Sequence, residues 1–529
     1  MKTKRMIIVA MLIMLFVLVL FLPGYWLSEA SAAGTFPSLK GVATDNGILV
    51  GVNDDGFNTP YFNNTIPDNF DSVTPGNRME FKNIHPCPPP WLINPNDPDH
   101  SSSVISWTTT LGQSQPGNLK CFVASAEDDE WEWGGVITGT TGLMNWAGEE
   151  NVGIYMTPLV WYLPASLPGW LQFIPPYTDD LTDAARKKLM EDHIKTIITH
   201  YCSFQRDDGE FTVYAADIVN EAFDSTGGIR EAGPWWEIPN FIDVAYRAAD
   251  EARDACGRPD LKLMYNDFGF EYDGYSGVKA TGMISYFAPL IIDSGMPLDG
   301  IGLQTHLFYD LDPDLASPTV PHDMSKLMAT MSRFNRELLV EVKITEVDIT
   351  FWNSETNLPI VYPAAAGGVK PYYLPQAEVF AEIAWACIVV NQFSVRNGFP
   401  GCTGYTTWGT NDQDTWRFWW LTDIRNFSED DAKVYLEYLD PLLFWDRQDM
   451  LWNPAKSGCA PPPSGNRSTA AYLYCPKAAY YRVYDMFVAP PISWAQFIYL
   501  PLIPGEATEV FAGPYPAPPS APFAPPAYP

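Results

Sequence analysis

The chain has 529 residues, of which 47% are hydrophobic, 14% aromatic and 18% charged. This composition supplies a large core and excludes a disordered or coiled-coil protein, so we expect one large globular domain or two. The formal net charge of −31 would repel nucleic acid and anionic membrane surfaces, which favours a neutral partner.

The N-terminus carries an export signal. A basic "MKTKR" precedes the unbroken apolar run "MIIVAMLIMLFVLVLFL", and Ala30, Ser31 and Ala32 offer small residues for cleavage. We therefore predict a signal peptide over residues 1–32 and a secreted protein. Because the run is about long enough to span a bilayer, an uncleaved N-terminal anchor and attachment to the cell surface are the alternative.

The eight cysteines suit an exported chain, because disulfides persist in oxidising compartments. Their spacing lacks the paired C-x-x-C of zinc sites, and we expect no metal and no cofactor. Three pairs bracket stretches rich in Pro, Gly or Asn, and elimination leaves a fourth. The predicted disulfides are Cys87–Cys121, Cys387–Cys402, Cys459–Cys475 and Cys202–Cys256.

Short apolar runs alternate with helical patterns along the chain. Strands are predicted over 152–161, 212–219, 261–267, 298–306, 341–349 and 404–410. Helices, from apolar residues at three and four spacing, are predicted between them over 179–202, 238–256 and 374–390. This alternation predicts an α/β fold, a (β/α)8 TIM barrel, with a doubly wound sheet as the runner-up. No G-x-G-x-x-G follows any of the strands, which counts against the runner-up.

Polar residues gather at the C-terminal ends of the predicted strands. In a barrel these ends converge on one rim, where catalytic side chains meet. Two glutamates that face each other across such a rim can cleave glycosidic bonds. The residues at the strand ends are Asn220, Glu221, Asn266, Asp267, Gln304, His306, Glu346, Asp348 and Trp408.

These motifs resemble one known family. The segments "DIVNEAFD", "YNDFGFE", "GIGLQTH", "ITEVDI", "TTWGTNDQDTWR" and the late "PLLFWD" with "PKAAYYRVYD" stand in the order seen in family 10 glycoside hydrolases, the endo-β-1,4-xylanases. Upstream, "NFDSVTPGNRMEF" and "LVWYLPASLPGWL" resemble the family's first and third strand regions. The resemblance implies a catalytic domain over 36–487, with insertions at about 87–126, 390–400 and 447–475, before a Pro-rich tail at 488–529.

The resemblance implies roles for the two glutamates. Glu221 corresponds to the general acid/base and Glu346 to the nucleophile of a retaining mechanism. Asn220 would hydrogen-bond the sugar 2-hydroxyl, and His306 and Asp348 would orient Glu346. Further substrate-binding and supporting residues implied by the family motifs are Asn77, Trp161, Gln304, Trp408, Trp416, Arg417 and Asn266.

The chain departs from the family's motifs in two places. Glu80 and Phe81 stand where the family has lysine and tryptophan, and Thr157 and Tyr162 stand where it has histidines. A missing charged hydrogen bond costs about 1.5–3 kcal/mol, so the preference for plain xylan is expected to be weakened. The alternative is that Arg78 takes the place of the missing lysine and specificity is ordinary.

The sequence thus predicts a secreted, monomeric, retaining endo-β-1,4-glycanase, with endo-1,4-β-xylanase as the leading activity and a polysaccharide as its only partner. Two other readings remain open at this point. One is a β-glycanase of different preference, and the other is a barrel that only binds glycan or serves as a cell-surface protein. A pure binder has no use for a general acid paired with a nucleophile, which counts against the last reading.

Overall fold

The computed structural model describes residues 37–53, 60–85, 137–156, 158–168, 171, 182–271, 277–309, 324–353, 358–359, 373–410, 421–422, 428 and 478–488. The predicted signal peptide, the segments 87–126 and 447–475, and the tail beyond Val488 lie outside these residues.

Eight parallel strands among the described residues form a closed barrel at the centre of the molecule. Each strand pairs in parallel with the next, and the last returns to the first, so the barrel has no free edge. The predicted TIM barrel is confirmed. In order around the barrel, the strands are β1 (Leu49–Asn53), β2 (Ser72–Thr74), β3 (Gly153–Met156), β5 (Val213–Asn220), β6 (Lys262–Asp267), β7 (Gly300–Leu303), β9 (Glu341–Asn353) and β11 (Cys402–Thr407).

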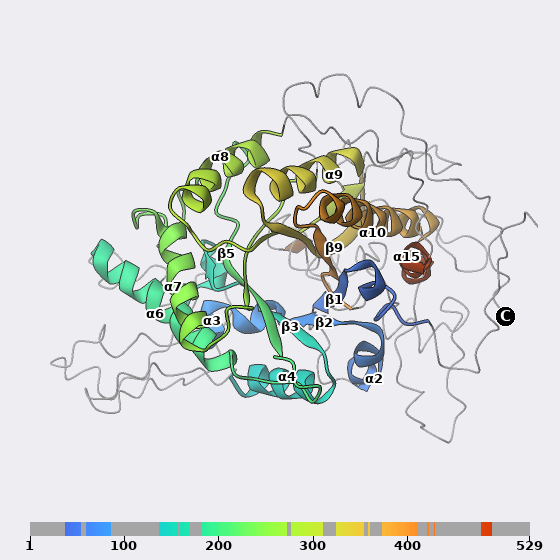
Figure 1. Cartoon of the computed structure of the whole chain (residues 1–529), viewed down its shortest axis with the longest axis horizontal. Coiled ribbons are helices and arrows are strands. Elements are labelled where there is room, and N and C mark those ends of the chain that lie inside the picture. The colour runs from blue at the N-terminus through green and yellow to red at the C-terminus, as the bar shows by residue number, and fades with distance from the viewer. Residues whose placement is uncertain are drawn as a thin grey trace, which may run out of the picture.

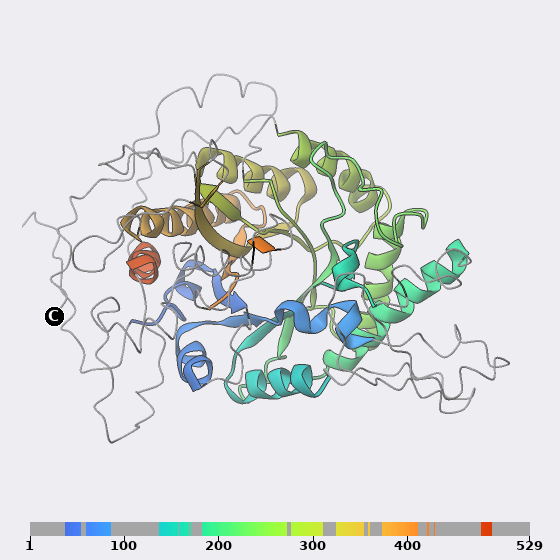
Figure 2. The ribbon, with the colours of Figure 1, turned by 180° about the vertical axis from the view of Figure 1, so that it is seen from behind.

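Helices form a ring around the barrel (Figures 1 and 2). The C-terminal α15 packs against α10 on its outside. The surrounding helices are α2 (Pro60–Asn69), α4 (Ile137–Glu149), α6 (Asp183–Tyr201), α7 (Phe241–Ala255), α8 (Val278–Ile292), α9 (Met324–Arg333), α10 (Tyr373–Arg396) and α15 (Ala478–Val488), with the short α3 (Phe81–Ile84) after β2.

The three predicted helices are present. Helix α6 starts after Thr182, whose hydroxyl accepts a hydrogen bond from the Ala185 amide at 3.2 Å, and it buries one apolar face. Helix α10 is long and apolar enough over Gln376–Arg396 to cross a membrane, alone among the described helices. Since 72% of that window is buried inside the protein, α10 has the character of a core helix.

Two predicted strands are interrupted. The run 152–161 forms β3 and then the two-residue β4 (Val160–Trp161), and the run 298–306 forms β7 and then β8 (His306–Tyr309). Between β7 and β8, Thr305 takes a left-handed φ of 60°. The Glu271 carboxylate accepts the Thr305 amide at 2.7 Å and so supports this turn. The interruption lets β8 pair with the upper part of β9.

Three predicted boundaries are wrong. Glu346 and Asp348 do not end their strand, because β9 continues to Asn353 by pairing with β8 and then with β10 (Leu358–Pro359). The motif "NFDSVTPGNRMEF" lies at β2, the second barrel strand, because the five-residue β1 precedes it. Helix α10 runs to Arg396, past the predicted helix end at residue 390.

Two predicted disulfides are confirmed. Cys202–Cys256 joins the C-terminal ends of α6 and α7 with a Cα–Cα distance of 6.3 Å. Cys387–Cys402 joins α10 to the start of β11 at 5.2 Å. The other two predicted pairs lie outside the described residues.

Candidate active site

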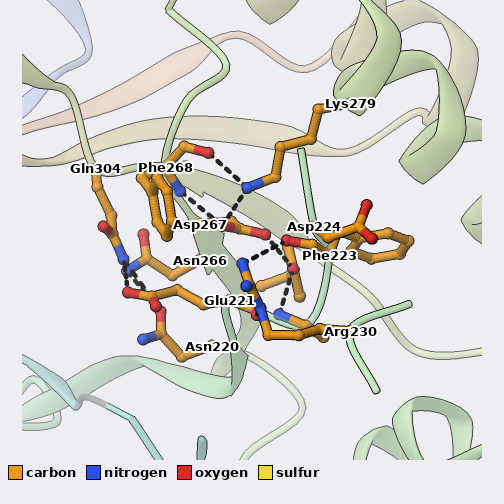
Figure 3. Close-up of polar contacts among 12 residues, drawn as sticks. Asn220, Glu221, Phe223, Asp224, Arg230, Asn266, Asp267, Phe268, Lys279 and Gln304 are labelled. Atoms are coloured by element: carbon orange, nitrogen blue, oxygen red, sulfur yellow. Dashed lines mark hydrogen bonds and ion pairs between the residues drawn. The ribbon is translucent and has the colours of Figure 1, made fainter. Parts of the chain in front are cut away.

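Glu221 lies at the end of β5, where two side chains donate to its carboxylate. Gln304 Nε2 donates to Oε1 at 2.9 Å, as Figure 3 shows, and Trp161 Nε1 donates to Oε2 at 3.1 Å. The donors come from the ends of β7 and β4, so the barrel rim brings together three residues that the sequence only suggested were neighbours.

The backbone of Glu221 is strained. Its φ is 54°, in a region that costs a residue other than glycine about 1–3 kcal/mol. Three hydrogen bonds hold this conformation. The Glu221 amide donates to the Asn266 carbonyl at 2.9 Å, the next amide donates to the Tyr265 hydroxyl at 2.9 Å, and Arg230 Nε donates to the Glu221 carbonyl at 3.2 Å. Strain that the surroundings maintain in this way is common where a side chain must point into a site.

The Glu221 carboxyl holds its proton more firmly than an ordinary glutamate. Burial, followed by the negative charge of Asp267 and that of Glu346, raises its pKa to about 7. The hydrogen bonds from Gln304 and Trp161 act in the opposite direction because they stabilise the ionised form. A carboxyl with this pKa can give a proton near neutral pH and take one back.

Glu346, on β9, has a contrasting environment. Asn266 Nδ2 lies 2.6 Å from its Oε1, and His306 Nε2 lies 3.1 Å from its Oε2. Asn266 is itself fixed by the Thr345 hydroxyl, which donates to its Oδ1 at 2.7 Å. The same Asn266 amide also donates to Asn220 Oδ1 at 3.1 Å. Each oxygen of the Glu346 carboxyl therefore has a hydrogen-bonding partner.

His306 links Glu346 to a second acid. Its Nδ1 lies 3.1 Å from Asp348 Oδ1, and its Nε2 faces Glu346. Burial opposes a charge on this imidazole, but the carboxylates of Asp348 and Glu346 outweigh burial and raise its pKa to about 9. A cation therefore lies beside Glu346 at neutral pH, as the predicted orienting role of His306 and Asp348 requires.

Asp267, whose charge acts on Glu221, forms a buried ion pair with Lys279. The sequence assigned this pair no role. Lys279 Nζ lies 2.7 Å from Asp267 Oδ1 and donates to the Phe268 carbonyl at 2.7 Å (Figure 3). Tyr265 donates its hydroxyl to Asp267 Oδ2 at 2.6 Å. The available signal was a single lysine in the first turn of an otherwise apolar helix, α8.

The family model for glycosyl hydrolase family 10 matches residues 38–426. The chain belongs to glycosyl hydrolase family 10. A β-1,4-xylanase of Dictyoglomus thermophilum is 27% identical over 417 residues, which cover 78% of this chain and 90% of that enzyme. An endo-1,4-β-xylanase of Humicola insolens is 26% identical over 61% of this chain and 62% of its own length.

Solved structures of family 10 share the fold. An endo-1,4-β-xylanase of Penicillium canescens superposes with a TM-score of 0.54 at 19% identity, over 87% of this chain and 99% of that one. An intracellular xylanase of Thermoanaerobacterium saccharolyticum, solved as a mutant with xylotetraose, gives a TM-score of 0.54 at 18% identity, over 85% and 99%. The protein is therefore a glycoside hydrolase with a TIM-barrel fold.

The described residues include only some of the other side chains that the family motifs suggest. Trp408 follows β11 and is partly buried, and its amide donates to the Val347 carbonyl at 3.1 Å, next to Glu346. Asn77 lies in the 3-10 turn Gly76–Met79, but its side chain lies outside the described part of the chain, as do Thr157, Trp416 and Arg417. Within the described part of the chain, no group of three or more metal-ligating side chains is brought together.

The departures from the family motifs are built differently from the sequence expectation. Glu80 is not an open acceptor in the cleft: it is 5% exposed, and Lys82 Nζ lies 2.7 Å from its Oε2. Lys82 also donates to the Ala165 carbonyl at 2.5 Å. The Arg230 guanidinium lies 4.6 Å from the centre of the Tyr162 ring. The cation beside Glu80 is therefore Lys82, and the expectation for Arg78 stays a prediction.

Proposed function

We propose that this protein is an exported, retaining endo-β-1,4-glycanase that hydrolyses xylan. One observation carries the proposal: the two glutamates at the rim have opposite environments. Glu221 is buried beside other negative charges and has a pKa of about 7. Glu346 accepts from Asn266 and lies beside the cationic His306. Two carboxyl groups in such different environments can supply the acid and the nucleophile of glycoside cleavage.

The mechanism follows from these states. A carboxylate oxygen of Glu346 attacks the anomeric carbon while Glu221 transfers its proton to the glycosidic oxygen, so the leaving sugar departs neutral. The product is a covalent glycosyl-enzyme. Water then attacks the same carbon while Glu221 takes its proton, and Glu346 leaves as a carboxylate. Two inversions give overall retention.

The remaining side chains serve binding in this proposal. Asn220, held by Asn266 and by Gln304 Nε2 at 3.4 Å, meets the sugar 2-hydroxyl. Trp408 lies under the reacting sugar, because an apolar ring suits the C–H face of a pyranose. Xylan is the proposed substrate because the relatives that match are named as xylanases.

The N-terminal segment 1–32 and the two disulfides among the described residues support export, since disulfides persist outside the cytosol. We propose a monomer, which light scattering on the purified protein would test. A dimer or larger oligomer at all protein concentrations would contradict the proposed monomer.

The decisive experiment compares wild type with Glu346→Gln and Glu221→Ala. Wild type should release reducing sugar from xylan with retained anomeric configuration by NMR. Glu346→Gln should fold normally but lose nearly all hydrolysis, because an amide cannot form the covalent intermediate. Glu221→Ala should keep activity on an aryl xylobioside with a good leaving group, and azide should accelerate its second step.

Equal and zero release by wild type and Glu346→Gln on a panel of β-glycans would contradict the proposal and favour a glycan-binding barrel. An inverted product would contradict the retaining mechanism. If Glu346→Gln kept a tenth of the wild-type rate, a different residue would be the nucleophile.

A further inference from the structure

Four buried aromatic side chains form a continuous layer beside β4. Phe81 and His85 come from α3 and its C-terminal end, His193 from α6, and Trp235 from the loop after β5. The Phe81 ring stacks on His193 with ring centres 3.7 Å apart and lies nearly parallel to Trp235 at 5.8 Å. We call these four residues the β4 stack.

The β4 stack makes two hydrogen bonds to one short piece of main chain. His193 Nε2 lies 3.0 Å from the Leu159 carbonyl, and Trp235 Nε1 donates to the Trp161 carbonyl at 3.1 Å. Leu159 and Trp161 lie on either side of Val160, so the two bonds hold the main chain at β4. The second bond is on the residue whose indole donates to Glu221.

The hydrogen bonds fix the protons of the two histidines. Because His193 Nε2 faces a carbonyl oxygen, it must carry the proton, which leaves Nδ1 of a neutral His193 as an acceptor. His85 Nδ1 lies 2.8 Å from that Nδ1 and must therefore donate. Burial lowers the pKa of His193 to about 3, and burial together with the charge of His193 lowers that of His85 well below its usual range. The pair is thus neutral and directional, running from His85 through His193 to β4.

We propose that the β4 stack positions Trp161, so that the indole N–H stays on Glu221 and sets how firmly Glu221 holds its proton. The proposal rests on the acid/base role proposed above for Glu221. The donor matters because a carboxylate that loses one N–H bond is less stable in its charged form. Beyond β4, the charged and titratable groups facing Glu221 are Asp267, Glu346, Tyr162 and Arg230.

The test measures the proton affinity of Glu221 in three variants. Trp235→Phe keeps a ring against Phe81 but removes the donor to the Trp161 carbonyl. His193→Leu removes the donor to the Leu159 carbonyl, and His193→Gln restores an N–H at a similar place. Complete loss of a hydrogen bond to a charged group corresponds to a shift of about one pH unit. Displacement of Trp161 in Trp235→Phe and His193→Leu should therefore raise the Glu221 titration by about half a unit, with His193→Gln close to wild type.

Two readouts separate the failure of this proposal from failure of the proposed function. The first is the Glu221 carboxyl titration by 13C NMR, assigned by difference with Glu221→Gln, which needs no activity. The second is the alkaline limb of kcat/KM on xylan, which should move up with the NMR value. An inactive wild type whose Glu221 titration still shifts in the variants would support the positioning role and overturn the enzymatic one.

Tyr480→Phe is the matched control. Its hydroxyl is also buried and donates to a main-chain carbonyl, that of Pro37 at 2.8 Å, but on α15 rather than at β4. It should lower the melting temperature without moving the Glu221 titration. If Trp235→Phe and His193→Leu behaved like Tyr480→Phe, with lower melting temperatures and an unchanged titration, the β4 stack would be core packing only and the proposal would be overturned.

Discussion

His306 Nε2 lies 3.1 Å from Glu346 Oε2. Its other nitrogen lies 3.1 Å from Asp348, so each ring nitrogen faces a carboxylate oxygen. Both contacts favour an N–H, and the imidazole is most stable with both protons. The relationship couples the charge beside Glu346 to the pH of the solution.

The first prediction concerns pH and stability. The pKa of His306 is raised from an ordinary 6.5 to about 9, so the folded state binds the proton more tightly than the unfolded state. This stabilisation is fully present below pH 6.5 and is lost as the pH rises through 9. The free energy of unfolding of wild type should therefore fall over that window by more than that of His306→Gln.

The quantity to measure is the difference in the free energy of unfolding between wild type and His306→Gln, because the contributions of Glu221 and other shared groups cancel in it. Denaturant unfolding at several pH values gives it directly. Parallel curves for wild type and His306→Gln between pH 6.5 and 9 would show that the imidazole is not a cation in the folded protein.

Much of this site followed from the order of strand ends alone. Glu221, Gln304 and Glu346 were predicted to meet because parallel strands in a barrel deliver their C-terminal ends to one rim. The turns could not be predicted in this way. No residue in "GLQTH" indicates that Thr305 takes a positive φ and divides the strand. That conformation depends on the distant Glu271, a tertiary contact without a local signature.

The second prediction concerns Asp267 as the largest charge that raises the pKa of Glu221. Asp267→Asn removes that negative charge and leaves the positive Lys279 in place, so Glu221 should lose its proton at lower pH. The alkaline limb of kcat/KM on xylan should move down by about one pH unit, if removal is worth a charged hydrogen bond. An unchanged limb in a folded variant would mean that Asp267 does not act on Glu221.

The third prediction concerns the stability of the same pair. Lys279→Met leaves Asp267 buried without its cation and should cost about 3–5 kcal/mol. Lys279→Met combined with Asp267→Asn should recover part of that loss, because no uncompensated charge remains. Urea unfolding of the three variants measures the coupling. Additive losses would contradict the strength of the ion pair seen at 2.7 Å.

The fourth prediction concerns the disulfides. Cys202–Cys256 closes a separation of 54 residues and Cys387–Cys402 one of 15. In the chain-entropy model these contribute about 4 and 3 kcal/mol, less any strain in the folded state. Replacing each pair by alanines should lower the unfolding midpoint, more for the longer loop. The reverse order would show that local packing at α10 outweighs chain entropy, and non-reducing peptide mapping should find both bonds in wild type.

Ion pairs were the part of the site least accessible from sequence. Lys82 and Lys279 look like ordinary surface lysines, and only the fold shows that one pairs with the buried Glu80 and the other with Asp267. A departure from a family motif, such as glutamate in a lysine's place, therefore cannot be interpreted until its neighbours are known.

The last prediction concerns substrate preference and depends on Lys82, the neighbour of Glu80. In the family motif a lysine stands at position 80, whereas here the cation comes from Lys82 and is engaged by Glu80 and the Ala165 carbonyl. An ammonium has three donors, so at most one remains for a sugar hydroxyl. Plain xylan should therefore have no clear advantage in kcat/KM over substituted xylan.

The exchange Glu80→Lys with Lys82→Glu keeps the ion pair but returns a lysine to the family position. It should raise kcat/KM on linear xylan about tenfold, the lower end of the value of a charged hydrogen bond, and leave substituted xylan nearly unchanged. Glu80→Gln with Lys82→Gln is the control, since it removes both charges and should give no such gain. A wild type that clearly prefers linear xylan, with no change on exchange, would show that the rebuilt pair does not govern specificity.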